Sequence, residues 1–316
     1  MSTTASTSEY DRFGPWVDEV RTPDDVPRLY RDHPIDFAAH RLVLKVPRNI
    51  ARRDATADMD LYDQLLLLDY DQLTVLSRRT GEDVGATGRQ RRGYAEQHLL
   101  LEDVVAVQNI VNLLDARLVV HTRDGQAVSV RYNGSAQQGI VGIVEALRRS
   151  VACGSPSATG QALISAARAM GEPRLPGPND RDVALATDFH LAARHNAHLT
   201  PWAWHGRRRV APNGTGIGGV VTRVLHAYSP MTLHGAIVSS DGRSLEIFGR
   251  HASLIRGGMP VLSAGRLIVP LTLDRVEVAA HPRYLEAMTV VMGSGQSAIE
   301  VVVPSGSQAH ELFASV

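Results

Sequence analysis

The sequence predicts a mainly β protein of the α+β class, organised as two similar halves. Three observations lead to this prediction. Short apolar runs rich in β-branched residues alternate with turn residues, one Asp-Gly pair marks a tight hairpin, and the order of these features recurs later in the chain. We expect each half to form an antiparallel sheet that a C-terminal helix closes.

The clearest segment lies between residues 97 and 149. Residues 99–107 and 117–122 are apolar runs typical of strands. The pair Asp124-Gly125 then supplies the positive φ that a tight hairpin needs before the next strand. Ser135 can cap a helix that ends in two arginines, and its apolar positions recur at helical spacing: Ile140, Ile143, Val144 and Leu147.

A weaker copy of this segment ends the chain. Residues 273–278, 288–291 and 299–302 repeat the strands, and a last helix is expected near residues 308–313. The match extends upstream, because Met59 and Met231, like Leu73 and Leu245, are 172 positions apart. A register held over so many segments predicts an internal repeat of two large copies.

The first half is expected to comprise a tail and packed arm at residues 1–35 and a domain at 36–150. Residues 1–8 are polar and are predicted to be disordered. In the arm, aromatic and apolar residues are expected to anchor on the domain: Phe13, Trp16, Leu29 and Tyr30. The domain should begin with strands at 41–46, 61–68 and 73–76, followed by a mobile polar loop at 78–93.

Residues 151–182 are predicted to be a linker, and residues 183–316 the second domain. The linker contains a short helix at 161–170 whose apolar stripe is expected to dock between the domains. Residues 183–199 contain several alanines and three histidines, and the histidines from His190 to His205 are expected to lie on a polar strand and turn. Residues 214–219 match the letters of a dinucleotide-binding G-x-G-x-x-G motif, but strand-like residues follow, so a flexible β connection is favoured.

Composition limits the classes of function. The formal net charge is +0 and the isoelectric point is near 7.3, so no global field favours nucleic acid. Cys153 is the single cysteine, which rules out an internal disulfide and suits a reducing cytoplasm. The N-terminus lacks the pattern of a signal peptide. Lys45 is the only lysine among many arginines, which suggests a GC-rich genome.

Two basic segments are candidate sites for an anion or another ligand. Clustered arginines favour bidentate capture of phosphate or carboxylate. The first segment follows the first strand and the second opens the second half; together they contain Lys45, Arg48, Arg52, Arg53, Arg207, Arg208 and Arg209. Solvated turns are the alternative interpretation.

Four histidines form a weaker candidate, for a metal: His190, His195, His198 and His205. Their spacing matches no helical H-x3-H pair and no cysteine accompanies them, so we expect no metal site and no cofactor. No nucleophile elbow, P-loop or H-E-x-x-H motif occurs, and an enzyme is therefore not favoured.

The order of features in residues 40–150 resembles bacterial pleckstrin-homology (PH)-like domains. The resemblance rests on the Asp-x-Leu-x-Val-Leu-Ser-Arg strand at 71–78, the strand leading into 101–104, the hairpin at 118–125 and the closing helix. It implies two PH-like domains, each a bent antiparallel sheet closed by a C-terminal helix. In that family ligands commonly meet the loop after the first strand, here residues 47–54, although the lysine-rich phosphoinositide pattern is absent.

These observations predict a cytoplasmic, non-catalytic tandem PH-like scaffold or adaptor. It is expected to bind a protein partner, which includes a second copy of itself, through sheet edges and the linker helix. Two alternatives remain open. One is peripheral binding to anionic membrane headgroups through the arginine loops, and the other is a metal-binding protein or enzyme that uses the region from His190 to His205.

Overall fold

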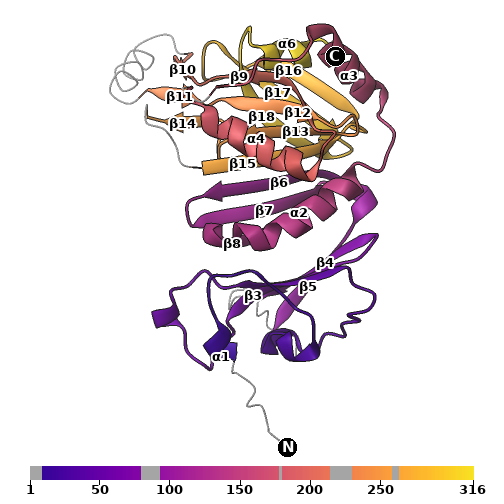
Figure 1. Ribbon diagram of the computed structural model, residues 1–316, viewed down its shortest axis with the longest axis vertical. Helices are drawn as coiled ribbons and strands as arrows, with labels where there is room; N and C mark the ends of the chain where they lie inside the picture. Colours follow the sequence, from indigo (N-terminus) through magenta and orange to yellow (C-terminus); the bar gives the residue numbers. More distant parts are fainter. Residues whose placement is uncertain (1–8, 80–92, 178–179, 214–229, 258–262) are drawn as a thin grey trace, which may run out of the picture.

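A computed structural model describes residues 9–79, 93–177, 180–213, 230–257 and 263–316. These residues form four antiparallel sheets and few helices (Figure 1), which confirms the predicted mainly β class. The predicted tail at 1–8, most of the polar loop at 78–93 and the glycine-rich segment at 214–219 lie outside the described residues.

The first sheet contains only residues of the first half. Its order is β1-β2-β3-β4-β5, and its strands are β1 (Asp18–Glu19), β2 (Leu42–Pro47), β3 (Tyr62–Leu68), β4 (Gln72–Arg78) and β5 (Tyr94–Leu100). The leucines of β3 are buried on both faces of this sheet. One face carries the N-terminal arm, where Phe13 and Tyr30 are buried as predicted, whereas Trp16 is exposed.

A sharp corner follows β5. Residues 99–107 were expected to be one strand, but a 3₁₀ turn (Leu101–Asp103) divides them. Leu101 is buried and its N–H donates to the Asp71 carbonyl at 2.7 Å, while Glu102 is exposed. The turn places Glu102 and Asp103 outside the strand pairing, and after it the chain continues as β6 (Val104–Asn112) in a different sheet.

The second sheet has seven strands and joins the two halves. Its order is β8-β7-β6-β15-β13-β12-β9, with β7 (Asp115–Thr122), β8 (Ala127–Asn133), β9 (Thr200–His205), β12 (Ala236–Ser240), β13 (Ser244–Gly249) and β15 (Ser263–Pro270). Strands β6 and β15 pair from Asn112 opposite Ser263 to Val107 opposite Ile268. The expectation of one separate sheet per half is therefore wrong, because this ladder makes the sheet continuous.

Two three-stranded sheets complete the second half. One comprises β10 (Arg208–Val210), β11 (Met231–Leu233) and β14 (Leu254–Arg256). The other comprises β16 (Arg275–Ala280), β17 (Ala287–Ser294) and β18 (Ser297–Pro304). The β17–β18 hairpin meets the β7–β8 hairpin, since the Ser297 hydroxyl donates to the Thr122 carbonyl at 2.6 Å.

Helices cover the sheets at several places. They are α1 (Glu9–Arg12), α2 (Gln137–Val151), α3 (Ala158–Met170), α4 (Val183–His195) and α6 (Gln308–Ala314). Helix α3 is the predicted linker helix, and the Ser157 hydroxyl caps it by accepting from the Gly160 N–H at 3.0 Å. No described helix combines the length and the apolar character needed to cross a membrane.

Helix α4 corrects the prediction that the histidines lie on a polar strand and turn, because His190 and His195 are part of this helix. Leu185, Phe189 and Ala192 recur at helical spacing and are buried against Ile237 and Phe248 of the sheet. Alanine, the strongest helix former, fills several of the other positions. The helical spacing of these apolar residues, which the sequence interpretation did not use, indicates the helix.

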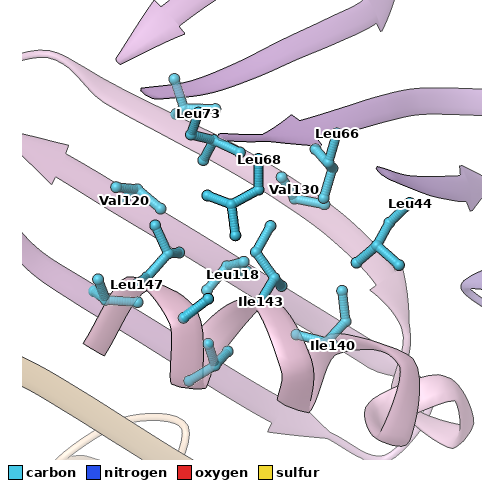
Figure 2. Close-up of a cluster of buried hydrophobic side chains, with 14 of the residues drawn as sticks. Leu44, Leu66, Leu68, Leu73, Leu118, Val120, Val130, Ile140, Ile143 and Leu147 are labelled. Atoms are coloured by element: carbon cyan, nitrogen blue, oxygen red, sulfur yellow. The ribbon is translucent and has the colours of Figure 1, made fainter. Parts of the chain in front are cut away.

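The two largest apolar clusters follow the two halves of the chain. In the first, Ile140, Ile143 and Leu147 of α2 face Leu118 and Val120 of β7 and side chains of the first sheet (Figure 2). The second lies between the seven-stranded sheet, β16–β18, α3 and α6. Ile268 of β15 belongs to the first cluster and Ala106 of β6 to the second, so the β6–β15 ladder also links the cores.

Two glycines of α2 should respond oppositely to alanine. A Cβ at Gly142 would meet only Leu42, at 3.8 Å, so Gly142→Ala should raise the free energy of unfolding by about 0.5–1 kcal/mol through helix propensity. A Cβ at Gly139 would lie 2.4 Å from the Val17 carbonyl oxygen, and Gly139→Ala should therefore displace the arm and destabilise the protein. Urea unfolding measures both variants, and equal effects would contradict this packing.

Candidate binding cleft between helices α2 and α4

A cleft of about 180 Å³ lies between α2 of the first half and α4 of the second. Both helices cover the same face of the seven-stranded sheet (Figure 1), because their core contacts, Val107 and Phe248, have the same orientation in the strand register. The sheet forms the floor of the cleft and the helices form its walls. We call this feature the α2–α4 cleft, and its lining includes Asn109, Val111, Gln137, Val141, Glu145, Asp188, Leu191, His195, Phe248 and Arg266.

The strand register fixes the floor. Phe248 of β13 is opposite Arg266 of β15, and Arg266 is opposite Asn109 of β6. Residues paired in this way project from one face of a sheet, so the three side chains form a row across the junction of the halves. The Arg266 guanidinium lies over the Phe248 ring, 5.6 Å from its centroid. The Asn109 Oδ1 accepts a 2.7 Å hydrogen bond from the Tyr132 hydroxyl, which fixes that amide.

A network of buried charges begins at Arg266. Its Nη1 lies 2.6 Å from Glu145 Oε1 on α2, and its Nη2 lies 2.6 Å from Glu246 Oε2 on β13. Glu145 also accepts from Arg148 Nε at 2.8 Å, and Arg148 Nη1 lies 3.1 Å from Asp241 Oδ2. Two arginines and three carboxylates thus tie the helix of the first half to strands and a turn of the second.

Burial and pairing have opposing effects on this network. Burial opposes ionisation of Glu145, but the adjacent Arg266 and Arg148 guanidinium groups outweigh it and lower the pKa of that carboxyl. Glu246 has 0% exposure, and burial raises its pKa despite the attraction of Arg266. An ion pair out of water is stable only when its partners stay in place, so the network depends on the docking of the two halves.

Asp188 on α4 differs from these carboxyls. It lines the α2–α4 cleft, and within the described residues its carboxylate has no hydrogen bond or ion pair at contact distance. Burial raises the pKa of Asp188 to about 6, and the positive charge of Arg250 limits the rise. Such a partly buried carboxylate, in a cleft whose helices contribute both apolar and polar side chains, is a feature typical of binding sites.

The first basic segment mainly holds the N-terminal arm. Lys45 is buried and its Nζ donates to the Asp25 carbonyl at 3.2 Å. Arg52 donates to the carbonyls of Phe13 and Asp11, and Arg48 donates to the Asp60 carbonyl at 3.4 Å. Arg53 is exposed, 3.7 Å from Asp54. These side chains lie near one another, but three of the four are engaged within the protein.

The second basic segment is divided in the same way. The Arg207 N–H donates to Asp182 Oδ2 at 2.9 Å, and its Nη2 donates to the Arg181 carbonyl at 2.7 Å. Arg208 and Arg209 are exposed on the short strand β10. The structure therefore places two solvent-facing arginines here, and the anion-binding prediction for both segments stays a prediction.

The four histidines do not form one site. His190 and His195 are exposed on α4 and His198 is exposed in the following turn, whereas His205 is buried on β9, where burial lowers its pKa to about 4. Among the residues that the structure describes, no group of three or more His, Cys, Asp or Glu side chains is arranged to hold a metal. Only His195 of the four lines the α2–α4 cleft.

Sequence patterns did not identify the cleft. Two signals were present. Arg266 and Glu246 are single charges inside apolar strand runs, and Glu145 and Arg148 have the i, i+3 spacing of a helical pair. Asp188 carries no such signal, because its environment is created by α4 docking beside a helix from the other half. Comparisons with protein-family models, curated proteins and solved structures find no match for the chain.

Removal of Arg266 should show how much the junction depends on the network. Arg266→Met leaves Glu145 and Glu246 without this partner and should lower the free energy of unfolding by about 3–5 kcal/mol. Adding Glu246→Gln should recover part of the loss, because it removes one buried charge. The control is Arg131→Met, which breaks an exposed pair with Asp115 and should change stability little. Equal losses in urea unfolding would contradict a buried network.

Asp188→Asn should stabilise the protein in a pH-dependent way. Because its folded pKa of about 6 exceeds the ordinary value of 3.8, the native state binds the proton more tightly, and stability falls as pH rises from about 4 to 6. The variant removes this cost, so it should gain about 1–2 kcal/mol at pH 8 and little at pH 4. Chemical unfolding at both values measures the gain, and the exposed variant Asp32→Asn should show none.

Proposed function

We propose that this chain is a non-catalytic tandem PH-like scaffold that binds a protein partner in the α2–α4 cleft. Its two modules correspond to residues 36–150 and 183–316, joined by the linker at 151–182. The observation that carries the proposal is that both halves line the same cleft. The first half contributes helix α2 and strand β6, and the second contributes helix α4 and strands β13 and β15. A site built in this way exists only when the two modules are docked.

The order of the elements supports two related modules. In the first half, β2 to β5 are followed by β6 to β8 and α2; in the second, β9, β12, β13 and β15 are followed by β16 to β18 and α6. Strands β7 (Asp115–Thr122) and β17 (Ala287–Ser294) have equal length and are offset by 172 positions. Strands β4 and β13 begin with the same offset, at Gln72 and Ser244. This agreement accords with duplication of one PH-like unit.

The surface around the cleft favours a protein partner. Its volume of about 180 Å³ is below the roughly 300–1,000 Å³ of small-molecule sites. Apolar side chains are exposed nearby: Leu191 on the α4 wall is 48% exposed, and Leu113 and Leu114 are 67% and 63% exposed. These two follow Asn112, whose strand partner Ser263 adjoins the floor residue Ala264. Exposed leucines beside a cleft are typical of protein-binding surfaces.

Leu113 strengthens this interpretation. It has φ 56°, a left-handed conformation that is costly for a side chain with a Cβ, at the tip of the β6–β7 hairpin. Leu113 is therefore a solvent-exposed leucine in a backbone conformation that glycine or asparagine would adopt more easily. Strain and exposure at the same residue are expected where a side chain serves an intermolecular contact.

The proposal is tested with two matched leucines. Leu191 and Leu285 are 48% and 49% exposed, but only Leu191 lines the cleft. The full chain and its Leu191→Ala and Leu285→Ala variants are used to purify partners from the source cell, with quantitative mass spectrometry and light scattering. A partner, or a second copy of the chain, should bind about five- to thirtyfold more weakly to Leu191→Ala, the effect of losing about 1–2 kcal/mol.

The control should retain its partner. If Leu191→Ala and Leu285→Ala recover the same proteins in the same amounts, the α2–α4 cleft is not the binding surface. Circular dichroism and the urea midpoint of each variant confirm that it is folded.

A further inference from the structure

We propose that the α2–α4 cleft receives a lysine or arginine side chain of the partner, whose cationic group pairs with Asp188. This inference rests on the proposed function and names the chemistry of the bound segment. It begins with a contrast between carboxyl groups. Glu145, Glu246 and Asp241 each lie within 3.1 Å of a guanidinium nitrogen, whereas Asp188 lacks such a contact among the described residues.

The charges around Asp188 favour a cation. Glu145 and Asp188 line the cleft, and Glu246 and Asp241 belong to the adjoining charged network. The guanidinium groups of Arg148 and Arg266 pair with Glu145, Asp241 and Glu246, and neither pairs with Asp188. The positive charge of Arg250 also acts on Asp188, but the two side chains form no ion pair at contact distance, and Arg250 Nη1 donates to the Ser263 carbonyl at 2.7 Å. Among the described residues that line the cleft, the remaining titratable side chain is His195, which is exposed at the end of α4. A bound cation would give Asp188 the close ion-pair contact that Glu145, Asp241 and Glu246 already have.

The walls suit the stem of a long basic side chain. Lysine and arginine bury their methylene groups along apolar surface while the charged head finds a polar partner. Val141 on α2 and Leu191 on α4 provide apolar surface on the two sides of the cleft that contains Asp188. Gln137 and Gln138 at the start of α2 offer amide oxygens as additional acceptors. The cleft thus combines apolar surface from Val141 and Leu191 with a carboxylate that has no contact partner among the described residues, which is complementary to an amphipathic cation.

Short peptides test this chemistry on the full chain. The probes are N-acetyl-Leu-Lys-Leu-amide, its norleucine analogue, which keeps the stem without the charge, and its glutamate analogue. Binding is followed by methyl NMR of Val141, Val144 and Leu191. At pH 7.5 the lysine peptide should shift these methyls and bind about tenfold more tightly than the norleucine peptide, while the glutamate peptide should not bind.

Asp188→Asn separates a specific ion pair from general attraction. The variant should reduce binding of the lysine peptide about tenfold and leave the norleucine peptide unchanged. Lowering the pH to 5 should weaken binding of the lysine peptide to the native chain but not to the Asp188→Asn variant, because only the native chain has a carboxylate at position 188 that takes up a proton. The exposed variant Asp32→Asn should behave like the native chain.

The outcomes distinguish this inference from the proposed function. Equal binding of the lysine and norleucine peptides, or binding of the lysine peptide that is insensitive to Asp188→Asn, would overturn the inference that a cationic side chain pairs with Asp188. Either result would still be compatible with a cleft that binds apolar side chains. Absence of methyl shifts with the lysine peptide at millimolar concentration would overturn it too. Partner recovery that depends on Leu191 is measured separately, so the scaffold proposal would stand or fall on its own result.

Discussion

The ladder between β6 and β15 is the constraint on which the rest of the molecule depends. It joins strands about 150 residues apart in the chain into one sheet and thereby sets the positions of α2 and α4. Without it, each half would present an open sheet edge, which exposes unpaired backbone groups to other chains. The pairing of β6 with β15 satisfies the backbone hydrogen-bonding groups of both edge strands within the chain, and it fixes the orientation of one half relative to the other. The α2–α4 cleft is a consequence of this geometry, since its floor is the joined edge.

The charged network around Arg266 fixes the same junction by another means. Apolar packing alone tolerates small shifts, because dispersion and burial change gradually with distance. The ion pairs of Arg266 with Glu145 and Glu246, at 2.6 Å, do not tolerate such shifts, because displacing one partner leaves the other charge buried and unpaired. Such pairs add little net stability but penalise alternative registers and angles. We interpret the network as the feature that specifies one docking of α2 on the second half, while the ladder and the cores supply most of the stability.

Local structure could be predicted from the sequence where short-range physics decides it. Asp124-Gly125 forms the expected hairpin turn, with Gly125 at φ 89°, and the apolar spacing of residues 140–147 correctly indicates the buried face of α2. The corner at Leu101 and the β6–β15 pairing depend on distant partners, and no local pattern encodes them. The cleft could not be predicted for the same reason. Glu145 and Asp188 belong to different halves and acquire their roles only when α2 and α4 lie side by side.

The contrast between Arg266 and Asp188 bears on why the cleft exists. The cleft contains a guanidinium group, Arg266, that is paired with two carboxylates, and a carboxylate, Asp188, that has no contact partner in the described part of the chain. If only stability mattered, an asparagine at position 188 of α4 would avoid burying a charge, and an alanine would in addition favour the helix. Proteins retain such costly groups mainly where binding or catalysis recovers the cost. The same reasoning applies to Leu113, exposed and left-handed beside the end of the cleft floor. Two locally unfavourable residues at one junction, one charged and one apolar, are complementary to a partner segment that is itself both cationic and apolar.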